Sequence, residues 1–295
     1  MTALLVALPG NEAMAENIAK HVGGEIASLE SRSFPDGESY FRYLSPLEGR
    51  SVALICTLDR PNKKFLPLAF AAATARELGA SQIGLIAPYL AYMRQDQRFH
   101  AGEALTSTIF ARTISPLFDW LITVDPHLHR RSSLSEIYDI PAHIVQASPL
   151  FASWITKNVE HPILIGPDEE SAQWVGAIAG TCHAPHVILK KERKGDRDVA
   201  VSMPAIAGLE SATPILIDDI ISSGHTMRET IEHLKLAGAR APICMAVHGI
   251  FAENAYEILL QTGAVRIVTA NTITHESNAI DVCRVISGAL GKILG

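Results

Sequence analysis

Short apolar runs alternate with amphipathic segments along almost the whole chain of 295 residues. The apolar runs have the length of buried strands, and the amphipathic segments have the length of helices. Strands that alternate with helices in this way form βαβ units with parallel sheets. The expected strands are 4–8, 52–58, 83–88, 120–124, 163–166, 187–190, 215–218, 243–247 and 267–270. The expected helices are 11–22, 65–78, 105–117, 148–158, 171–180, 226–237, 252–261 and 278–290.

A boundary near residue 145 divides the expected strands into two similar groups. We therefore expect one α/β domain at 1–145 and a second at 146–295, with a cleft between them. Loops at the carboxyl ends of parallel strands bind ligands in such domains. The stretch 190–198 is highly charged and has no apolar periodicity, so we expect it to be an irregular, mobile loop.

Composition narrows the class of protein. With 48% hydrophobic and 19% charged residues, the chain has ample apolar material for a globular core. A net charge of −6 argues against broad binding to nucleic acid or to a membrane surface, but it allows a local basic pocket. No apolar run approaches the roughly 20 residues that span a bilayer, so we expect a cytoplasmic protein. Cys56 and Cys244 lie in apolar runs typical of buried, reduced thiols.

The segment 214–226 carries the strongest functional signal. An apolar run leads into two adjacent carboxylates, a loop of small hydroxyl residues with a glycine, and then a helix. Loop N–H groups and a helix N-terminus bind phosphate, and carboxylates can bind ribose hydroxyls directly or through Mg²⁺. The pattern indicates a site for a phosphorylated sugar, with an ordinary turn and helix cap as the alternative. Its candidate ligands are Asp218, Asp219, Ser222, Ser223, Gly224, His225 and Thr226.

Two further segments place polar side chains after expected strands. The stretch 89–99 offers tyrosines, arginines and a glutamine, which suit a nucleotide, although its composition alone favours an ordinary loop. His127 and His129 follow the strand 120–124, and their spacing raises the possibility of zinc. No third ligand stands out nearby, so a histidine that helps to hold Mg²⁺–triphosphate is the better hypothesis, beside that of an exposed turn.

Two more segments concern charge. Asp168 follows the strand 163–166 and precedes a helix, so it is equally well explained as a metal ligand and as a helix cap. Lys191, Arg193 and Lys194 form a basic cluster that could close on a polyphosphate. Taken alone, such a cluster is more often a solvated surface.

In combination, these motifs resemble those of ribose-phosphate diphosphokinases, the enzymes that make phosphoribosyl diphosphate (PRPP). The matching segments keep the family's order along nearly the whole chain: Phe34 to Glu38, Tyr92 to Asp96, Val124 to His127, Pro167-Asp168, Lys191 to Arg193 and Ile217 to Thr226. Ser222 stands where many relatives have a third acid, as in the archaeal-like branch, and 98–104 is also similar to that branch.

The resemblance implies an α/β fold with two similar phosphoribosyltransferase-type domains, each with a mainly parallel sheet flanked by helices. It implies that ATP is held by Arg94, Gln95, Asp96 and His127, while Phe34, Asp36 and Glu38 reach adenine from a neighbouring subunit of a homo-oligomer. It further implies that His127 and Asp168 organise Mg²⁺, that Lys191 and Arg193 are catalytic, and that the loop from Asp218 to Thr226 binds ribose 5-phosphate.

The implied activity is transfer of the diphosphoryl group of ATP to ribose 5-phosphate. His225 stands where the family has a glycine, and it could either hinder the phosphate or add a contact to it. Glu169 and Glu170 stand where many relatives have small residues. These departures keep open the alternative of a catalytically silent paralogue that regulates a true synthetase. A phosphoribosyltransferase that consumes PRPP is a third hypothesis, but it accounts only for the loop 218–226.

Overall fold

The structure is a computed structural model that describes residues 3–194, 198–202 and 208–295, without the side chains of 190–202. The chain divides into two compact units. Unit 1 comprises residues 1–146 together with 283–295, and unit 2 comprises residues 147–282. No helix among the described residues is long and apolar enough to cross a membrane.

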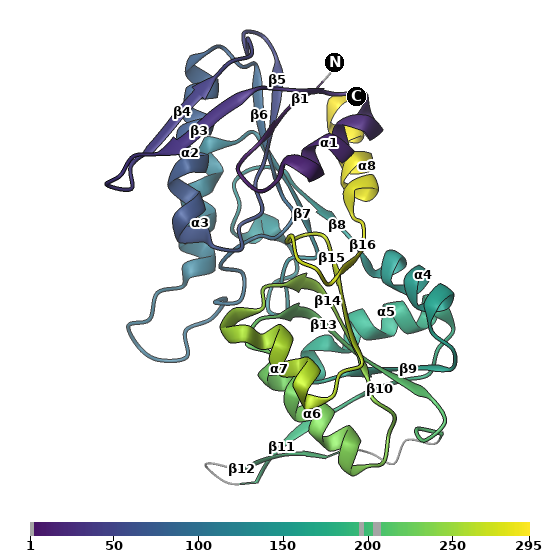
Figure 1. Cartoon of the computed structure of the whole chain (residues 1–295). Coiled ribbons are helices and arrows are strands. Elements are labelled where there is room, and N and C mark those ends of the chain that lie inside the picture. The colour runs from purple at the N-terminus through teal and green to yellow at the C-terminus, as the bar shows by residue number, and fades with distance from the viewer. Residues whose placement is uncertain (1–2, 195–197, 203–207) are drawn as a thin grey trace. The chain divides into compact units, whose positions relative to one another are not determined.

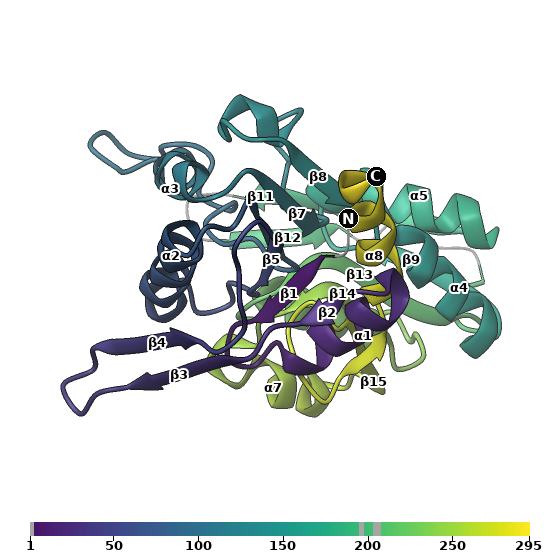
Figure 2. The same ribbon diagram turned by 90° about the horizontal axis from the view of Figure 1, so that it is seen from above.

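Unit 1 is built on a six-stranded parallel sheet in the order β2-β1-β5-β6-β7-β8 (Figure 1). Its strands are β1 (Leu4–Ala7), β2 (Glu25–Ile26), β5 (Ser51–Ile55), β6 (Gln82–Ala87), β7 (Trp120–Val124) and β8 (Ala142–Val145). Its helices are α1 (Glu12–Val22), α2 (Pro61–Glu77), α3 (Thr106–Ile114) and α8 (Cys283–Leu294), with 3-10 turns η1 (Ser115–Leu117) and η2 (Leu134–Glu136). An antiparallel hairpin of β3 (Leu29–Ser33) and β4 (Ser39–Tyr43) is inserted between β2 and β5 (Figure 2).

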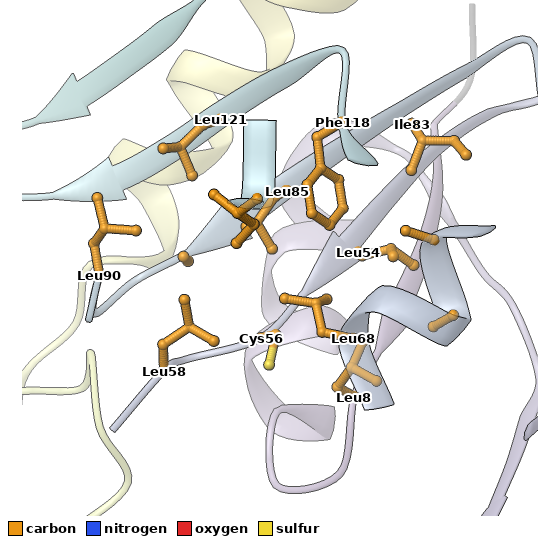
Figure 3. Close-up of a cluster of buried hydrophobic side chains, with 14 of the residues drawn as sticks. Leu8, Leu54, Cys56, Leu58, Leu68, Ile83, Leu85, Leu90, Phe118 and Leu121 are labelled. Carbon is orange, nitrogen blue, oxygen red and sulfur yellow. The ribbon is translucent and has the colours of Figure 1, made fainter. Parts of the chain in front are cut away.

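The core of unit 1 follows from the alternation of side chains along its strands. Val52, Leu54 and Cys56 point to one face of the sheet, and apolar residues of α2, among them Leu68, pack against that face. Figure 3 shows this cluster, in which Leu54, Leu68 and Leu85 are buried side by side. Each such side chain contributes about 1.5–3 kcal/mol by leaving water. This packing fixes the strand ends from which the functional loops leave.

Unit 2 repeats the strand order of unit 1. Its parallel sheet has the order β10-β9-β13-β14-β15-β16, and β11 pairs with β12 as an antiparallel hairpin. The strands are β9 (Pro162–Gly166), β10 (His186–Ile188), β11 (Lys190–Lys194), β12 (Asp198–Ser202), β13 (Thr213–Ile221), β14 (Ile243–Gly249), β15 (Arg266–Ala270) and β16 (Asn278–Ile280). The helices are α4 (Ser148–Asn158), α5 (Ala172–Cys182), α6 (His225–Leu236) and α7 (Ala255–Thr262), with η3 (Glu169–Ser171) and η4 (Ala252–Asn254).

The C-terminal segment differs from the sequence-based expectation in two ways. The helix expected at 278–290 is instead the short strand β16 followed by α8. The side-chain amide of Asn278 donates to Thr269 Oγ1 at 2.9 Å and to the carbonyl of Ala270 at 3.0 Å, which ties this segment to β15. Helix α8 groups with unit 1, where it packs against α1, although we expected residues 146–295 to form one domain.

Both hairpins were absent from the sequence-based prediction. The charged stretch 190–198 was expected to be irregular, yet Lys190 pairs with Ser202 and Lys194 pairs with Asp198 across β11 and β12. That part of the prediction was wrong, because all five residues of β11 are charged and a strand with two polar faces has no apolar alternation to reveal it. The hairpin of β3 and β4 was missed for the same reason, since its Ser31 and Ser33 obscure the alternation.

The four cysteines are free, as expected. Cys56 and Cys244 are buried, and burial raises the pKa of each thiol to about 12. Both therefore behave as packed apolar groups.

Candidate active site

Strand β13 extends beyond its neighbour β9, and this extension places two acidic residues at the edge of the unit 2 sheet. β13 pairs with β9 only from Thr213 to Leu216, whereas its pairing with β14 continues to Ile221. Asp218 and Asp219 therefore lie inside a strand, past the point where pairing with β9 stops. We expected the strand to end at Asp218, but the pairing with β14 prolongs it.

Asp168 lies just after β9. Its side chain accepts a hydrogen bond from the N–H of Ser171 at 3.4 Å, and Ser171 Oγ donates to the carbonyl of Asp168 at 2.6 Å. Gly166 permits this tight turn, because a Cβ there would lie 2.3 Å from Ser171 Oγ. Asp168 is therefore a helix cap, which was one of its two expected roles.

Asp168, Asp218 and Asp219 influence one another electrostatically. Burial raises the pKa of Asp218 well above its usual value, and the negative charges of Asp219 and Asp168 raise it further. The N–H of Asp219 donates to Asp218 Oδ1 at 2.9 Å, which only partly offsets this effect. Carboxylates that repel one another in this way suit a divalent cation, which takes oxygen ligands.

The loop of small residues follows directly. Gly224 adopts a left-handed conformation with φ of +70° and is the N-cap of α6. The N–H of Arg228 makes the first helical hydrogen bond to the carbonyl of Gly224, at 2.9 Å. The preceding N–H groups have no partner inside the helix and form an anion-binding end. Ser222 is half-buried and Ser223 is exposed, so their hydroxyls can reach a ligand at this end.

A second loop supports this one. The N–H groups of Ile250 and Phe251 donate to the carbonyl of Ile221 at 2.9 and 3.1 Å, and the N–H of Ala252 donates to the carbonyl of Ser222 at 3.0 Å. Phe251 has a φ of +46°, and two of the next three residues are also left-handed. Such conformations are costly and persist where surrounding contacts fix them, commonly near functional sites. Sequence analysis missed this supporting loop, since nothing in its composition marks it.

His225 is the first residue of α6 and is exposed. Its Nε2 atom lies 3.1 Å from a carboxylate oxygen of Glu229, one helical turn further on. Its Nδ1 atom lies 3.5 Å from the guanidinium of Arg228. The imidazole thus has partners on its own helix.

The predicted ATP residues of unit 1 lie in the loop after β6. Asp96 is buried and pairs with Arg130, with 3.1 Å between Oδ1 and Nη1. The Oε1 atom of Gln95 accepts a hydrogen bond from Thr106 Oγ1 at 2.5 Å. Arg94 is exposed. Asp96 and Gln95 therefore shape the loop, whereas the side chain of Arg94 is presented to solvent.

His127 lies in the loop after β7, the strand that pairs with β6. Its ring contacts that of His129 edge to face, with 4.0 Å between the centroids. Asp125 has a φ of +32°, which is uncommon for a residue with a side chain, and its N–H donates to the carbonyl of Val145 at 3.0 Å. Because β6 and β7 are parallel neighbours, the two loops share one edge of the unit 1 sheet.

The segment Phe34 to Glu38 is the turn of the β3–β4 hairpin. Its residues Phe34, Asp36 and Glu38 are all exposed. The N–H of Phe34 donates to the carbonyl of Glu38 at 2.8 Å, and the N–H of Glu38 donates to Asp36 Oδ1 at 3.1 Å. The sequence Pro35-Asp36-Gly37 is a turn signal that could have revealed this hairpin.

The two predicted catalytic residues belong to the unit 2 hairpin. Lys191 and Arg193 are both in β11, where they pair with Val201 and Val199. Their side chains lie outside the part of the chain that the structure describes.

Comparison with known proteins identifies the family. A family model described as the N-terminal domain of ribose phosphate pyrophosphokinase matches residues 3–117, and a phosphoribosyl transferase domain model matches residues 133–285. The ribose-phosphate pyrophosphokinase of Sulfurisphaera tokodaii is 33% identical, over 94% of this chain and 96% of its own. The chain belongs to the ribose-phosphate pyrophosphokinase family. The enzyme of the same name from Methanopyrus kandleri is 30% identical, over 96% of each chain.

The fold of the ribose-phosphate pyrophosphokinase family is confirmed independently. The crystal structure of phosphoribosylpyrophosphate synthetase from Mycobacterium smegmatis matches with a TM-score of 0.87, at 20% identity, over 100% of this chain and 99% of that chain. The expected α/β fold with two phosphoribosyltransferase-type domains is therefore correct. Ribose-phosphate pyrophosphokinases are transferases, which confirms the expected class of enzyme.

Sequence analysis missed one residue that forms an ion pair with a residue of the predicted ATP motif. Arg130 pairs with Asp96, yet sequence analysis assigned it no role. Its position directly after His127 and His129 gave no signal, because an ion pair between two loops depends on the strand order rather than on spacing in the sequence.

Proposed function

We propose that this chain transfers the diphosphoryl group of ATP to the C1 hydroxyl of ribose 5-phosphate, giving PRPP and AMP. The observation that supports this most directly is in unit 2. There Asp168, Asp218 and Asp219 lie within electrostatic reach of one another, beside a hydroxyl loop that opens a helix. Membership of the ribose-phosphate pyrophosphokinase family supplies the reaction that this arrangement fits.

The ribose 5-phosphate would be held by the loop after β13. Its phosphate would accept hydrogen bonds from the N–H groups at the start of α6 and from the hydroxyls of Ser222, Ser223 and Thr226, with His225 beside it. Its ring hydroxyls would donate to Asp218 and Asp219. Gly224 keeps the backbone open at the turn, since its left-handed conformation suits a residue without a Cβ.

Mg²⁺ fits the same residues. Burial raises the pKa of Asp218, and the negative charges of Asp219 and Asp168 raise it further. A hard divalent ion favours such a group of carboxylate oxygens. Asp168 would be a ligand of Mg²⁺ or of its waters, and His127 of unit 1 would contact the waters of Mg²⁺–ATP. When bound, Mg²⁺ would neutralise the phosphate oxygens.

ATP would be held by Arg94, whose exposed side chain can reach it, with Gln95 and Asp96 shaping the loop behind. The attacking hydroxyl reaches the β-phosphorus and AMP leaves. Phosphoryl transfer needs positioning and charge neutralisation more than covalent chemistry. Lys191 and Arg193 would neutralise the charge that develops on the transferred group.

The exposure of Phe34, Asp36 and Glu38 at a hairpin turn supports their assignment to the adenine of a neighbouring subunit. The protein would then be a homo-oligomer whose isolated subunit is inactive. Its location in the cytoplasm stays a prediction.

The test is the formation of AMP and PRPP from ATP and ribose 5-phosphate with Mg²⁺ present. Omitting ribose 5-phosphate should abolish AMP release, because hydrolysis alone is not the reaction. Calorimetry that detects ATP binding without turnover, at any Mg²⁺ concentration, would instead support the silent paralogue. Consumption of PRPP with a nucleobase would support the phosphoribosyltransferase alternative, which leaves the family match at 3–117 without a role.

A further inference from the structure

The two units share a strand order, and in each unit the chain adds strands first on one side of the first strand and then on its other side. The strand order therefore reverses at that first strand, which is β1 in unit 1 and β9 in unit 2. In unit 2 the chain passes from β9 to β10 on one side, and β13 later pairs on the other side of β9. In unit 1 it passes from β1 to β2, and β5 later pairs on the other side of β1. Open parallel sheets bind ligands beyond the carboxyl ends of the strands at such a reversal. In unit 2 that place is the proposed ribose 5-phosphate site.

The corresponding place in unit 1 is a cavity of about 220 Å³. It lies beyond the ends of β1 and β5, and the inserted β3–β4 hairpin forms one of its walls. The start of α2 forms another wall. Its lining residues are Leu8, Pro9, Ser31, Arg32, Ser33, Ser39, Phe41, Cys56, Lys63, Lys64 and Pro67. A phosphate group and several waters fit this volume, since a water occupies roughly 30 Å³ in the liquid.

Hydroxyl and ammonium groups gather in this cavity. Ser33 and Ser39 are directly opposite each other in the hairpin, and Ser31 shares their face. Lys63 and Lys64 are both in the first turn of α2. Serine hydroxyls donate hydrogen bonds and lysine supplies positive charge, which is a combination that binds oxyanions.

The two lysines differ in their partners. Lys64 forms an ion pair with Asp59 and donates to the carbonyl of Thr57 at 3.0 Å. Lys63 has no ion-pair partner among the residues that the structure describes. The guanidinium of Arg32 lies over the rings of Phe34 and Tyr40, at 4.7 and 4.4 Å from their centroids. Arg32 Nε also lies 4.0 Å from a carboxylate oxygen of Glu30. Among the described residues, Lys63 is therefore the cation of this cavity that has no ion-pair partner, and it is exposed to solvent at the cavity.

The position of Lys63 is electrostatically unfavourable. The N-terminus of a helix carries partial positive charge, so acidic residues are favoured in the first turn and cations are disfavoured. The first turn of α2 holds two lysines and no acid. Residues that are unfavourable for local structure occur most often at functional sites, so lysines in the first turn of a helix are expected where they bind an anionic ligand.

We propose that this cavity of unit 1 binds a phosphate-type oxyanion, either inorganic phosphate or the phosphate of a small phosphomonoester. Lys63 supplies the charge, and Ser31, Ser33 and Ser39 supply hydrogen bonds. The site differs in chemistry from the one in unit 2, where the reversal point carries three carboxylates. The inserted hairpin has Ser31, Ser33 and Ser39 on the wall and Phe34 at the turn, so a bound anion restrains the hairpin.

Amide hydrogen exchange of the hairpin, residues 29–43, tests the proposal on the full-length protein. Inorganic phosphate should slow exchange in the wild type, and Lys63→Ala should need about tenfold more phosphate for the same protection, because one charged hydrogen bond is lost. Lys63→Glu should abolish the protection and still fold, since an acid is favoured at the start of a helix. Lys20→Ala, which removes an exposed lysine of α1, is the matched control and should respond like the wild type.

Ribose 5-phosphate, which has no adenine to contact the hairpin turn, serves as a further probe. Protection by ribose 5-phosphate but not by inorganic phosphate, again lost in Lys63→Glu, supports the site with a phosphomonoester as its ligand. Hairpin exchange that no phosphate compound slows, or that phosphate slows equally in Lys63→Glu and the wild type, overturns the proposal. The readout does not depend on turnover, and the comparison of Lys63→Glu with the wild type separates this cavity from the substrate sites of the proposed reaction.

Discussion

The carboxylate of Asp96 and the guanidinium of Arg130 join two loops of unit 1, with 3.1 Å between Oδ1 and Nη1. The Asp96 side chain is only 1% exposed, whereas that of Arg130 is 37% exposed. The pair therefore fixes the loop after β6 against the loop after β7. The first of these loops carries Arg94 and the second carries His127, so the ion pair sets the geometry of the predicted ATP residues.

Asp96→Asn should lower the free energy of unfolding by about 1–3 kcal/mol and raise KM for ATP, because Arg130 loses the negative charge of its buried partner. Urea denaturation and steady-state kinetics measure the two effects. Glu25→Gln is the control, since the Arg50–Glu25 pair is largely exposed, and it should cost less than about 1 kcal/mol. An unchanged KM for ATP in Asp96→Asn would contradict the positioning role.

Asp218→Asn should stabilise the metal-free protein near neutral pH. Because the folded-state pKa of Asp218 is raised above its ordinary value of 3.8, the folded protein binds this proton more tightly than the unfolded chain does. The free energy of unfolding therefore falls as pH rises through the folded-state pKa of Asp218. Below the pKa of Asp218 in the unfolded chain, this loss of stability is absent. Thermal melts should show a higher Tm for the variant at about pH 7 and no difference at or below about pH 4.

The same variant reports on Mg²⁺. Added Mg²⁺ should raise the Tm of the wild type more than that of Asp218→Asn, because the cation relieves repulsion that the variant has already lost. Glu160→Gln changes an exposed carboxylate of unit 2 and should leave both responses as in the wild type. If Asp218→Asn were less stable than the wild type at neutral pH without metal, electrostatic repulsion between Asp218 and the neighbouring carboxylates would be refuted.

Gly224→Ala should weaken the use of ribose 5-phosphate. A Cβ at a φ of +70° costs roughly 1–2 kcal/mol and distorts the start of α6, so KM for ribose 5-phosphate should rise while ATP binding persists. Gly238→Ala, with a φ of +73° just beyond the other end of the same helix, is the matched control. It should lose similar stability without the change in KM, and equal kinetic effects in both variants would count against the loop.

Lys191→Ala and Arg193→Ala should each reduce kcat by roughly 10²- to 10³-fold, as expected for a group that stabilises transition-state charge. Lys194→Ala, a basic neighbour in the same strand, should retain most of its turnover. Rapid-quench measurement of AMP formation separates the chemical step from substrate binding. Full turnover in Lys191→Ala would remove this residue from the mechanism.

Much of the fold was predictable because local patterns agreed with it. The helix predicted at 148–158 coincides with α4, and the strand predicted at 120–124 coincides with β7. In both segments the apolar pattern of the sequence predicts the element that forms, and no contact with a distant segment changes it. The hairpin strands β3 and β11 were missed, since their serines and charges lack alternation. The turn signal Pro35-Asp36-Gly37 could have revealed the first hairpin, whereas β11 consists of charged residues alone. Asp96 was predicted as an ATP ligand, but its burial against Arg130 emerged only from the fold.

The sequence by itself determined the family, the α/β class and the order of the motifs, because short-range periodicity and residue types at strand ends are written directly into it. Only the tertiary structure decided that Asp218 and Asp219 lie within a prolonged strand near Asp168, and that a serine-lined basic cavity occupies the matching position of unit 1. Strand order and register bring residues together that are far apart in the chain, and these depend on the packing of whole sheets and helices rather than on any local pattern.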